Sequence, residues 1–215
     1  MQRLIGGVLA MLIALAAMPS ANAATLSPEQ VVQKIADDLA STIGARRDEL
    51  KNDRDKLISE IDDILLPHFD IEYASILVLG QSARSTSPQQ RSRFAKAFYN
   101  SIAHRYAEGL LNYTRGNVRV LPFRGELNDK RTIVRTEVVL DDGKTVAVDY
   151  AFRKGNAGDW KAYDVIIEGI SYITNYRNQV AAEIKATNLD ALIIRLETQG
   201  EKALESMEKS QQGGA

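Results

Sequence analysis

Every second residue is a larger apolar side chain in the stretch Thr145-Val146-Ala147-Val148-Asp149-Tyr150-Ala151-Phe152. This alternation places Val146, Val148, Tyr150 and Phe152 on one face of an extended chain. A period of two is typical of a β-strand that buries one of its sides. The segment therefore predicts a strand with one face turned toward an apolar interior.

The strand pattern continues on both sides of this stretch. Before it, residues 132–140 alternate with Val134, Thr136, Val138 and Leu140 on one face, and 141–144 (Asp-Asp-Gly-Lys) is a hairpin turn. After it, the Gly-rich turn 155–158 leads to a further strand over 160–167, and residues 118–122 predict a short strand upstream. Three strands joined in sequence by tight turns predict an antiparallel meander.

Helical patterns flank this meander. Ser27 and Ser87 each begin a Ser-Pro-x-Gln capping box, which predicts helices from residues 28 and 88. Asp70 and Asn188 are candidate caps for helices over 71–79 and from 189, and further helices are predicted over 57–65 and 170–186. Helices, then a meander, then helices indicate an α+β fold with several helices packed on one curved antiparallel sheet.

The N-terminus has the features of a secretion signal. A basic start precedes an apolar run from Leu4 to Met18, and Ala21-Asn22-Ala23 gives the small-x-small pattern of a signal peptidase site. The alternative is a membrane anchor, but the run is shorter than the roughly 20 residues of a span. We expect removal of residues 1–23, a single domain over 24–209 and a flexible tail over 210–215. The mature protein is then expected to be exported.

Composition excludes several classes of protein. The 215 residues include no Cys, so disulfide scaffolds, Cys-ligated zinc, thiol nucleophiles and iron–sulfur clusters are ruled out. The formal net charge is −1, which argues against a nucleic-acid-binding protein because such proteins usually carry a strong basic excess. The 45% apolar content fits a folded globular chain.

Few residues suggest catalysis. His68 and His104 are isolated, with no metal-ligand spacing, and we interpret both as structural. The S-x-x-K match at 206–209 lies in a polar terminal helix outside the predicted core, so we attribute it to chance. Asp149 and Asp164 fall within strands, where anchoring a basic or backbone group is the favoured role and a catalytic acid is the alternative. We therefore predict no catalytic residue, no metal site and no cofactor.

The block from Trp160 to Ser171 (WKAYDVIIEGIS), followed by Asn175-Tyr176-Arg177, resembles the signature of the MlaC family, also called toluene-tolerance or ABC-transporter auxiliary proteins. Upstream, residues 64–70 and 78–80 resemble the family's P-x-x-D…LG segment, and Gln90-Arg91 begins a similar helix. The resemblance covers about residues 27–204. Ala83-Arg84 departs from it, because the family pattern has an aromatic residue before the Arg.

The resemblance implies a periplasmic phospholipid carrier with an NTF2-like cone. In such a protein the acyl chains occupy an apolar cavity and the head group stays near solvent. The implied partners are an outer-membrane lipoprotein–porin complex and an inner-membrane ABC transporter complex with an MCE-domain subunit. Transport between them maintains the lipid asymmetry of the outer membrane. The protein would be a monomer and not an enzyme, with glycerophospholipid as cargo.

Side-chain direction supplies candidate cavity residues. They are apolar or aromatic and lie on the long helix, on the alternating face of the sheet and at the end of the helix before Gly80: Leu79, Phe98, Ile102, Tyr106, Leu110, Val146, Val148, Tyr150, Phe152, Tyr163, Val165 and Ile167. A second group from the family motif is expected to fix the strand-to-helix turn, with Asp164 paired to Arg177 or another basic group: Trp160, Asp164, Gly169, Ser171 and Arg177.

Two other functions remain open from the sequence. One is a periplasmic adaptor that carries no lipid, which would have a filled core. The other is an NTF2-like enzyme that uses Asp149 or Asp164 as a base, which would need a perturbed carboxylate facing a wet pocket.

Overall fold

Five antiparallel strands lie side by side in chain order in a computed structural model that describes residues 25–111, 117–123, 128, 130–140 and 142–212. The predicted signal peptide, Tyr113, Asp141 and residues 213–215 lie outside the described residues. The strands are β1 Val118–Val120, β2 Arg131–Val139, β3 Thr145–Lys154, β4 Trp160–Ile167 and β5 Ile170–Ser171. This meander confirms the predicted α+β class.

The register of β2 and β3 brings their predicted faces together. Val134 is opposite Tyr150, and Thr136 is opposite Val148. Val134 and Thr136 are almost completely buried, and the Thr136 hydroxyl donates a 2.5 Å hydrogen bond to the Val148 carbonyl. The prediction that Leu140 continues this face is wrong, because β2 ends at Val139 and Leu140 is 44% exposed.

The exit from the sheet differs from the prediction of a helix starting at Ile170. Glu168 and Gly169 both have positive φ, 49° and 79°, which is the geometry of a two-residue type I′ hairpin turn. The chain therefore folds back and pairs Ile170 with Ile167 before any helix begins. Ser171 then caps the next helix by accepting a hydrogen bond from the Thr174 N–H at 3.1 Å.

Before the sheet, the helices begin where the capping signals predict. Both capping boxes are present: Gln30 N–H donates to Ser27 Oγ at 3.3 Å, and Gln90 N–H donates to Ser87 Oγ at 3.1 Å. Asp70 caps in the same way. The elements are α1 Pro28–Thr42, η1 Gly44–Arg46, α2 Arg47–Leu50, α3 Arg54–Leu65, η2 Leu66–His68, α4 Ile71–Leu79, η3 Gly80–Ser85 and α5 Pro88–Leu111.

Three helices follow the sheet: α6 Tyr172–Ala186, α7 Leu189–Gln199 and α8 Glu201–Gln212. Asn188 caps α7 as predicted. The expectation that the S-x-x-K segment 206–209 lies outside the core is wrong, because Met207 is buried, as are Ala203 and Leu204 of the same helix. Gly200, at φ 54°, allows α8 to turn back against the other helices. Helix α8 also continues beyond residue 210, where we expected the tail to begin.

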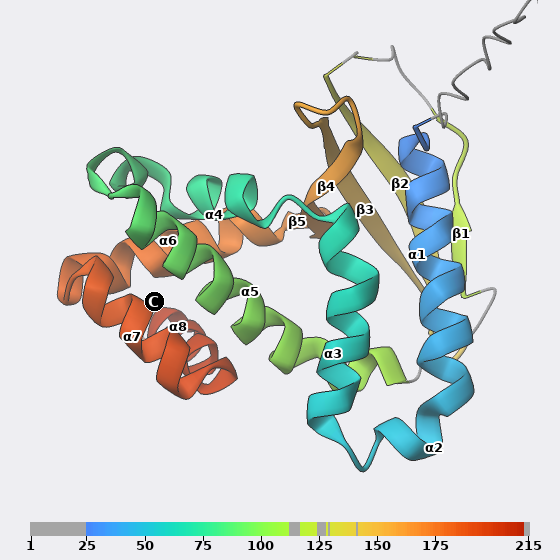
Figure 1. Cartoon of the computed structure of the whole chain (residues 1–215), viewed down its shortest axis with the longest axis horizontal. Helices are drawn as coiled ribbons and strands as arrows, with labels where there is room; N and C mark the ends of the chain where they lie inside the picture. Colours follow the sequence, from blue (N-terminus) through green and yellow to red (C-terminus); the bar gives the residue numbers. More distant parts are fainter. Residues whose placement is uncertain (1–24, 112–116, 124–127, 129, 141, 213–215) are drawn as a thin grey trace, which may run out of the picture.

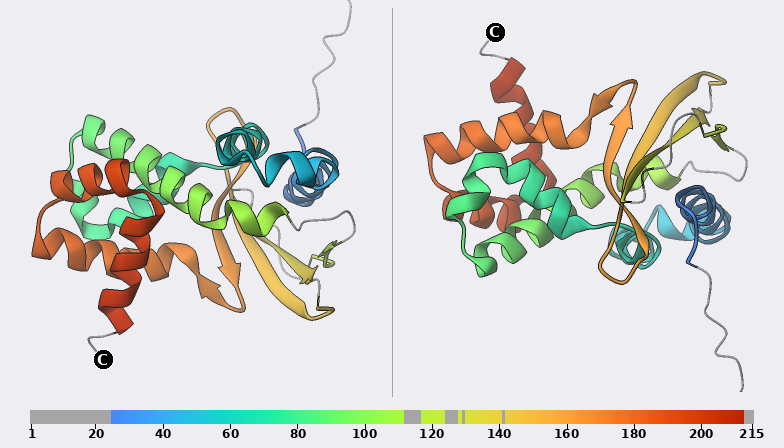
Figure 2. Two further views of the ribbon diagram at one scale, coloured as in Figure 1. Left: turned by 90° about the horizontal axis from the view of Figure 1, so that it is seen from below. Right: turned by 90° about the horizontal axis from the view of Figure 1, so that it is seen from above.

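The molecule has a sheet part and a helical part (Figures 1 and 2). Helix α1 packs on the sheet and α3 packs on α1, whereas α4 and α6 contact β4 and gather with α7 and α8 at the side of the sheet. Helix α5 joins the two parts, since it packs on α3 and also on α4, α7 and α8. Helix α5 contributes Phe94 and Ala97 to one apolar cluster and Ala107 to another. Within the described residues, no helix is both long and apolar enough to cross a membrane.

Substitution of a glycine with positive φ, Gly169, and of a helical glycine, Gly109, should affect stability differently. Gly169→Ala should lower the free energy of unfolding by about 1 kcal/mol, because a Cβ disfavours positive φ. Gly109→Ala should leave it unchanged or raise it by about 0.5 kcal/mol, because Gly109 is helical and a Cβ there meets no atom within 4 Å. Urea unfolding checks both, and equal destabilisation would contradict the role given to the turn.

Candidate functional site

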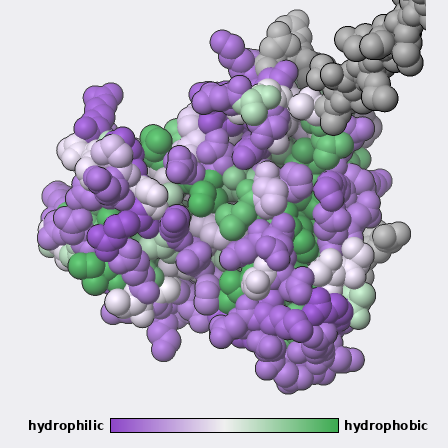
Figure 3. Space-filling model, in the orientation of Figure 1, coloured by the Kyte–Doolittle hydropathy of each residue, from purple (hydrophilic) through white to green (hydrophobic). Residues whose placement is uncertain are grey.

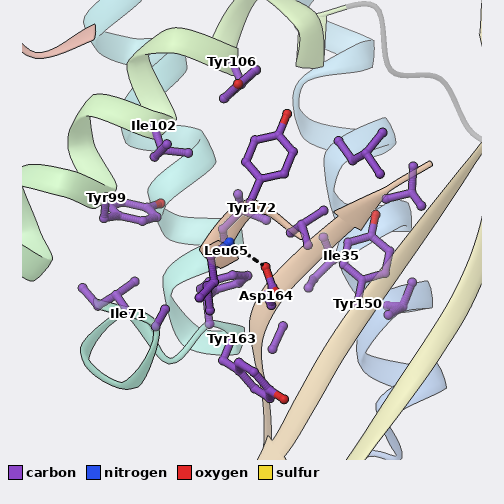
Figure 4. A pocket seen from close by; sticks show the side chains of 18 of the residues that line it. Ile35, Leu65, Ile71, Tyr99, Ile102, Tyr106, Tyr150, Tyr163, Asp164 and Tyr172 are labelled. Atoms are coloured by element: carbon purple, nitrogen blue, oxygen red, sulfur yellow. Dashed lines mark hydrogen bonds between the residues drawn. The ribbon is translucent and has the colours of Figure 1, made fainter. Parts of the chain in front are cut away.

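A cavity of about 470 Å³ lies between the sheet and the helices. Strands β1, β2, β3 and β4 form one wall, and Phe69 and residues of α1, α3, α4, α5 and α6 form the rest. Figure 4 shows labelled side chains of α1, α3, α4, α5, α6, β3 and β4 around the space. Apolar side chains also reach the surface between α3 and α5, at the centre of Figure 3. The apolar side chains of the sheet and of the helices therefore do not fill the space between these two layers.

The cavity wall is almost entirely apolar. Its polar members are six tyrosines and one carboxylate, and the other lining residues are aliphatic, phenylalanine or glycine. The polar members are Tyr99, Tyr106, Tyr150, Tyr163, Tyr172, Tyr176 and Asp164. Such a wall excludes water and offers dispersion contacts to an apolar ligand.

Ten of the twelve candidate cavity residues line this space: Phe98, Ile102, Tyr106, Leu110, Val148, Tyr150, Phe152, Tyr163, Val165 and Ile167. Leu79 does not, because it is 1% exposed and packs in the cluster of α4–α8. Val146, near the start of β3, does not line it either, although the Val138 side of the same cross-strand pair does. Apolar character and strand face alone do not separate these two positions from the others.

The candidates from the sequence omit the α1, α3, α4 and α6 parts of the wall and several further residues of α5 and the sheet. Val32, Ile35 and Leu39 of α1 face the cavity, and so do Tyr172 and Tyr176 of α6. The helical spacing of the α1 residues predicts a buried stripe, which is a usable signal, but it does not say what the stripe packs against. The α6 tyrosines depend on where that helix begins, and the β5 strand shifts its start to Tyr172.

An irregularity in β4 gives Asp164 its role. Ala162 is opposite Phe152 and Val165 is opposite Tyr150, so Tyr163 and Asp164 occupy a bulge. The Ser171 hydroxyl donates to Asp164 Oδ2 at 2.6 Å, and the Ile173 N–H donates to Oδ1 at 3.1 Å. The carboxylate thus ties β4 to the first turn of α6.

The predicted pairing of Asp164 with Arg177 is wrong. Within the described residues, no basic group forms an ion pair with Asp164, and the Arg177 Nε–H donates to the Leu77 carbonyl at 2.7 Å. The Arg177 side chain also packs over Gly80. It therefore joins α6 to the end of α4. Trp160 is distant from this turn, at the start of β4 opposite Lys154, whose ammonium lies 5.6 Å from the Trp ring centroid.

The other candidate acid, Asp149, lies on the outer face of the sheet. It alternates with Val148 and Tyr150 and is opposite Arg135 and Ile166. Asp149 is also absent from the lining of the cavity. Within the described residues, no group of three or more His, Asp or Glu side chains could hold a metal ion.

Several wall tyrosines have raised pKa values. Burial raises the pKa of Tyr150 to about 12. Burial also raises the pKa of Tyr99, and the Asp62 carboxylate, which accepts its hydroxyl at 2.8 Å, adds to the shift. Burial likewise raises the pKa values of Tyr172 and Tyr176. The neutral phenol is therefore the form that this wall tolerates.

An α+β fold that keeps an apolar cavity between sheet and helices has the architecture of a small-ligand binding protein. Residues 33–198 match the family described as MlaC protein, and the chain belongs to that family.

Individual relatives agree with this assignment. The intermembrane phospholipid transport system binding protein MlaC of Haemophilus influenzae is 32% identical over 177 residues, covering 81% of this chain and 82% of that protein. The toluene tolerance protein ttg2D of Pseudomonas putida is 27% identical over 181 residues, covering 84% and 83%. A solved structure of a phospholipid-binding protein from Ralstonia solanacearum, in complex with a phospholipid, superposes with a TM-score of 0.72. It is 27% identical and covers 81% of this chain and 97% of that one.

Asp164 and Asp149 provide a matched pair for a stability test. Asp164→Ala should lower the free energy of unfolding by about 2 kcal/mol or more, because the buried Ile173 N–H and the half-buried Ser171 hydroxyl lose their acceptor. Asp149→Ala, on the outer face, should change it by less than about 0.5 kcal/mol. Urea unfolding of both variants gives the comparison, and a tolerant Asp164 would contradict the anchoring role.

The buried tyrosines predict loss of stability in alkali. A pKa raised on folding contributes stability that is fully present below the unfolded value of about 10. That stability is lost as pH rises through the folded value, which is about 12 for Tyr150. Unfolding free energy should therefore be level up to about pH 10 and fall above it. The fall should be shallower in Tyr150→Phe, and an identical profile in this variant would contradict the prediction.

Proposed function

We propose that the protein is a carrier of glycerophospholipid and that it holds the acyl chains in the cavity. The observation that carries the proposal is the unfilled apolar space between the sheet and the helices. The similarity to the Ralstonia solanacearum protein in complex with a phospholipid supports the same ligand class. A filled core, as a cargo-free adaptor would have, does not fit this cavity.

The energetics of acyl chains explain why such a carrier needs this wall. Each methylene moved out of water contributes about 0.8 kcal/mol. A sixteen-carbon chain exposed to water would thus cost roughly 12 kcal/mol, which makes unaided transfer between membranes very slow. A dry wall of aliphatic and aromatic side chains removes most of that cost. The transfer needs no covalent step, so the protein would act as a carrier and not as an enzyme.

The polar head group would remain at the mouth of the cavity, in contact with water. The single wall carboxylate, Asp164, already accepts two hydrogen bonds from the protein. The wall therefore presents no charged clamp to a phosphate, and we expect weak selectivity among head groups.

The cellular setting follows from the family and from the predicted signal. Cleavage after Ala23 would release the mature protein, with its domain over 24–209, into the periplasm. There it would shuttle lipid between an outer-membrane lipoprotein–porin complex and an inner-membrane ABC transporter complex with an MCE-domain subunit. Such transport would maintain the lipid asymmetry of the outer membrane.

Native mass spectrometry tests the carrier function directly. The protein is purified without detergent, and lipid is extracted from the same sample. A mass excess that matches glycerophospholipid and is lost on denaturation supports the proposal. A chain that is free of lipid, and stays so after mixing with phospholipid vesicles, contradicts it.

Two neighbouring residues of β4 provide a matched test of the cavity. Val165 lines it, whereas Ile166 lies on the outer face, opposite Asp149. Val165→Trp should lower lipid affinity about tenfold or more, because the indole displaces space for at least two methylenes. Ile166→Trp should retain the affinity of the unchanged protein. Equal lipid content in the two variants, measured by native mass spectrometry, would place the lipid elsewhere.

A further inference from the structure

A second hollow, of about 440 Å³, lies at the end of the sheet where β2 begins and β3 ends. Its lining residues are Tyr73, Lys130, Arg131, Arg153, Lys154 and Gly155. Four of these six side chains are cationic, although the whole chain has a formal net charge of −1. The positive charge at this hollow is therefore a local concentration.

The register of the sheet sets these cations against each other. Arg131 is directly opposite Arg153, and the Lys154 N–H donates to the Lys130 carbonyl at 2.9 Å. Like charges in opposite positions of two strands are destabilising. Among the described residues Asp70 compensates Arg153 alone of these four cations. The other three leave a local conflict of like charges, and such conflicts mark functional positions.

The two arginines are held in place before any ligand binds. The Arg131 Nη2–H donates to the Tyr73 hydroxyl at 2.8 Å, and Arg153 forms a 2.5 Å ion pair with Asp70. The two guanidinium carbons lie 5.8 and 4.4 Å from the centroid of the Tyr73 ring. A guanidinium fixed in this way is suited to the oxygens of a phosphate group.

Three positive charges are left for a ligand. Within the part of the chain that the structure describes, no carboxylate lies within 4.0 Å of the side-chain nitrogens of Lys130, Arg131 or Lys154. The hollow also adjoins the lipid cavity through one pair of rings, since Tyr73 and the wall residue Tyr163 have centroids 5.2 Å apart. If the hollow binds a ligand that is part of a larger surface, the cavity is brought close to that surface.

We propose that this hollow docks on the phosphate groups of anionic lipid headgroups at a bilayer surface, an inference that rests on the proposed function. In a protein of near-neutral net charge, a negative surface attracts mainly the basic hollow. The attraction therefore sets the orientation of the protein on that surface. The contact with Tyr163 favours a lipid surface over free phosphate as the source, because a carrier benefits from docking where its cargo is exchanged.

The test is flotation of the whole protein with vesicles of phosphatidylcholine, or of equimolar phosphatidylcholine and phosphatidylglycerol, at low ionic strength. The variant is Lys130→Gln/Lys154→Gln, which leaves the contacts of Arg131 and Arg153 intact. The matched control is Lys96→Gln/Lys185→Gln, which removes the same charge from exposed positions of α5 and α6. Binding to the anionic vesicles should weaken about 30-fold in the hollow variant, fall with added salt, and be retained in the control.

Three results would overturn the proposal. They are absence of binding to anionic vesicles, equal weakening in both double variants, and calorimetric binding of inorganic phosphate at the lysines without any vesicle binding. Native mass spectrometry of each sample separates this proposal from the carrier function. If the hollow variant retains its bound lipid but no longer binds vesicles, the hollow is supported as a docking site. If the protein without substitutions contains no lipid, the carrier function itself is contradicted.

Discussion

The Asp164 carboxylate links the two halves of the molecule. It extends from a bulge in β4 and accepts hydrogen bonds from the Ser171 hydroxyl and the Ile173 backbone, at the start of α6. Together with the Glu168–Gly169 turn, it sets the direction in which α6 leaves the sheet. That direction places Tyr172 and Tyr176 on the cavity wall and α6 beside α4, where Arg177 bonds the Leu77 carbonyl. The junction of β4 and α6 at Asp164 therefore sets the position of the helical part of the protein.

The wall opposite the sheet is held open by polar contacts on its outer side. Tyr176 faces the cavity with its ring, while its hydroxyl donates to Glu208 of α8 at 3.0 Å, and Arg105 of α5 donates to the same carboxylate at 2.6 Å. One carboxylate of the last helix thus fixes two helices of the wall. The aromatic contacts of Tyr176 with Phe98 and Tyr172 continue this support. These contacts on the outer side of the helices hold the side chains in place, so that they line the cavity without filling it.

Local signals were sufficient to predict most of the elements. The capping boxes at Ser27 and Ser87 and the alternation in 145–152 gave helix starts and a strand face that the structure confirms. Contacts distant in sequence were not predictable in this way. Leu79 and Phe98 are equally apolar, but only their packing against other helices shows that one is core and the other cavity wall. The burial of Met207 and the backbone partner of Arg177 likewise depend on helices whose relative position no local pattern contains.

The uniformity of the cavity wall has a kinetic consequence. A saturated chain inside it would meet aliphatic and aromatic surface at each position, with the oxygens of Asp164 already engaged. Neighbouring positions of the chain would then differ little in energy, so the ligand would slide lengthwise by one carbon at a time over low barriers. Movement of the chain within the cavity would then be fast. The rate of lipid entry and release would be limited by passage through the opening of the cavity.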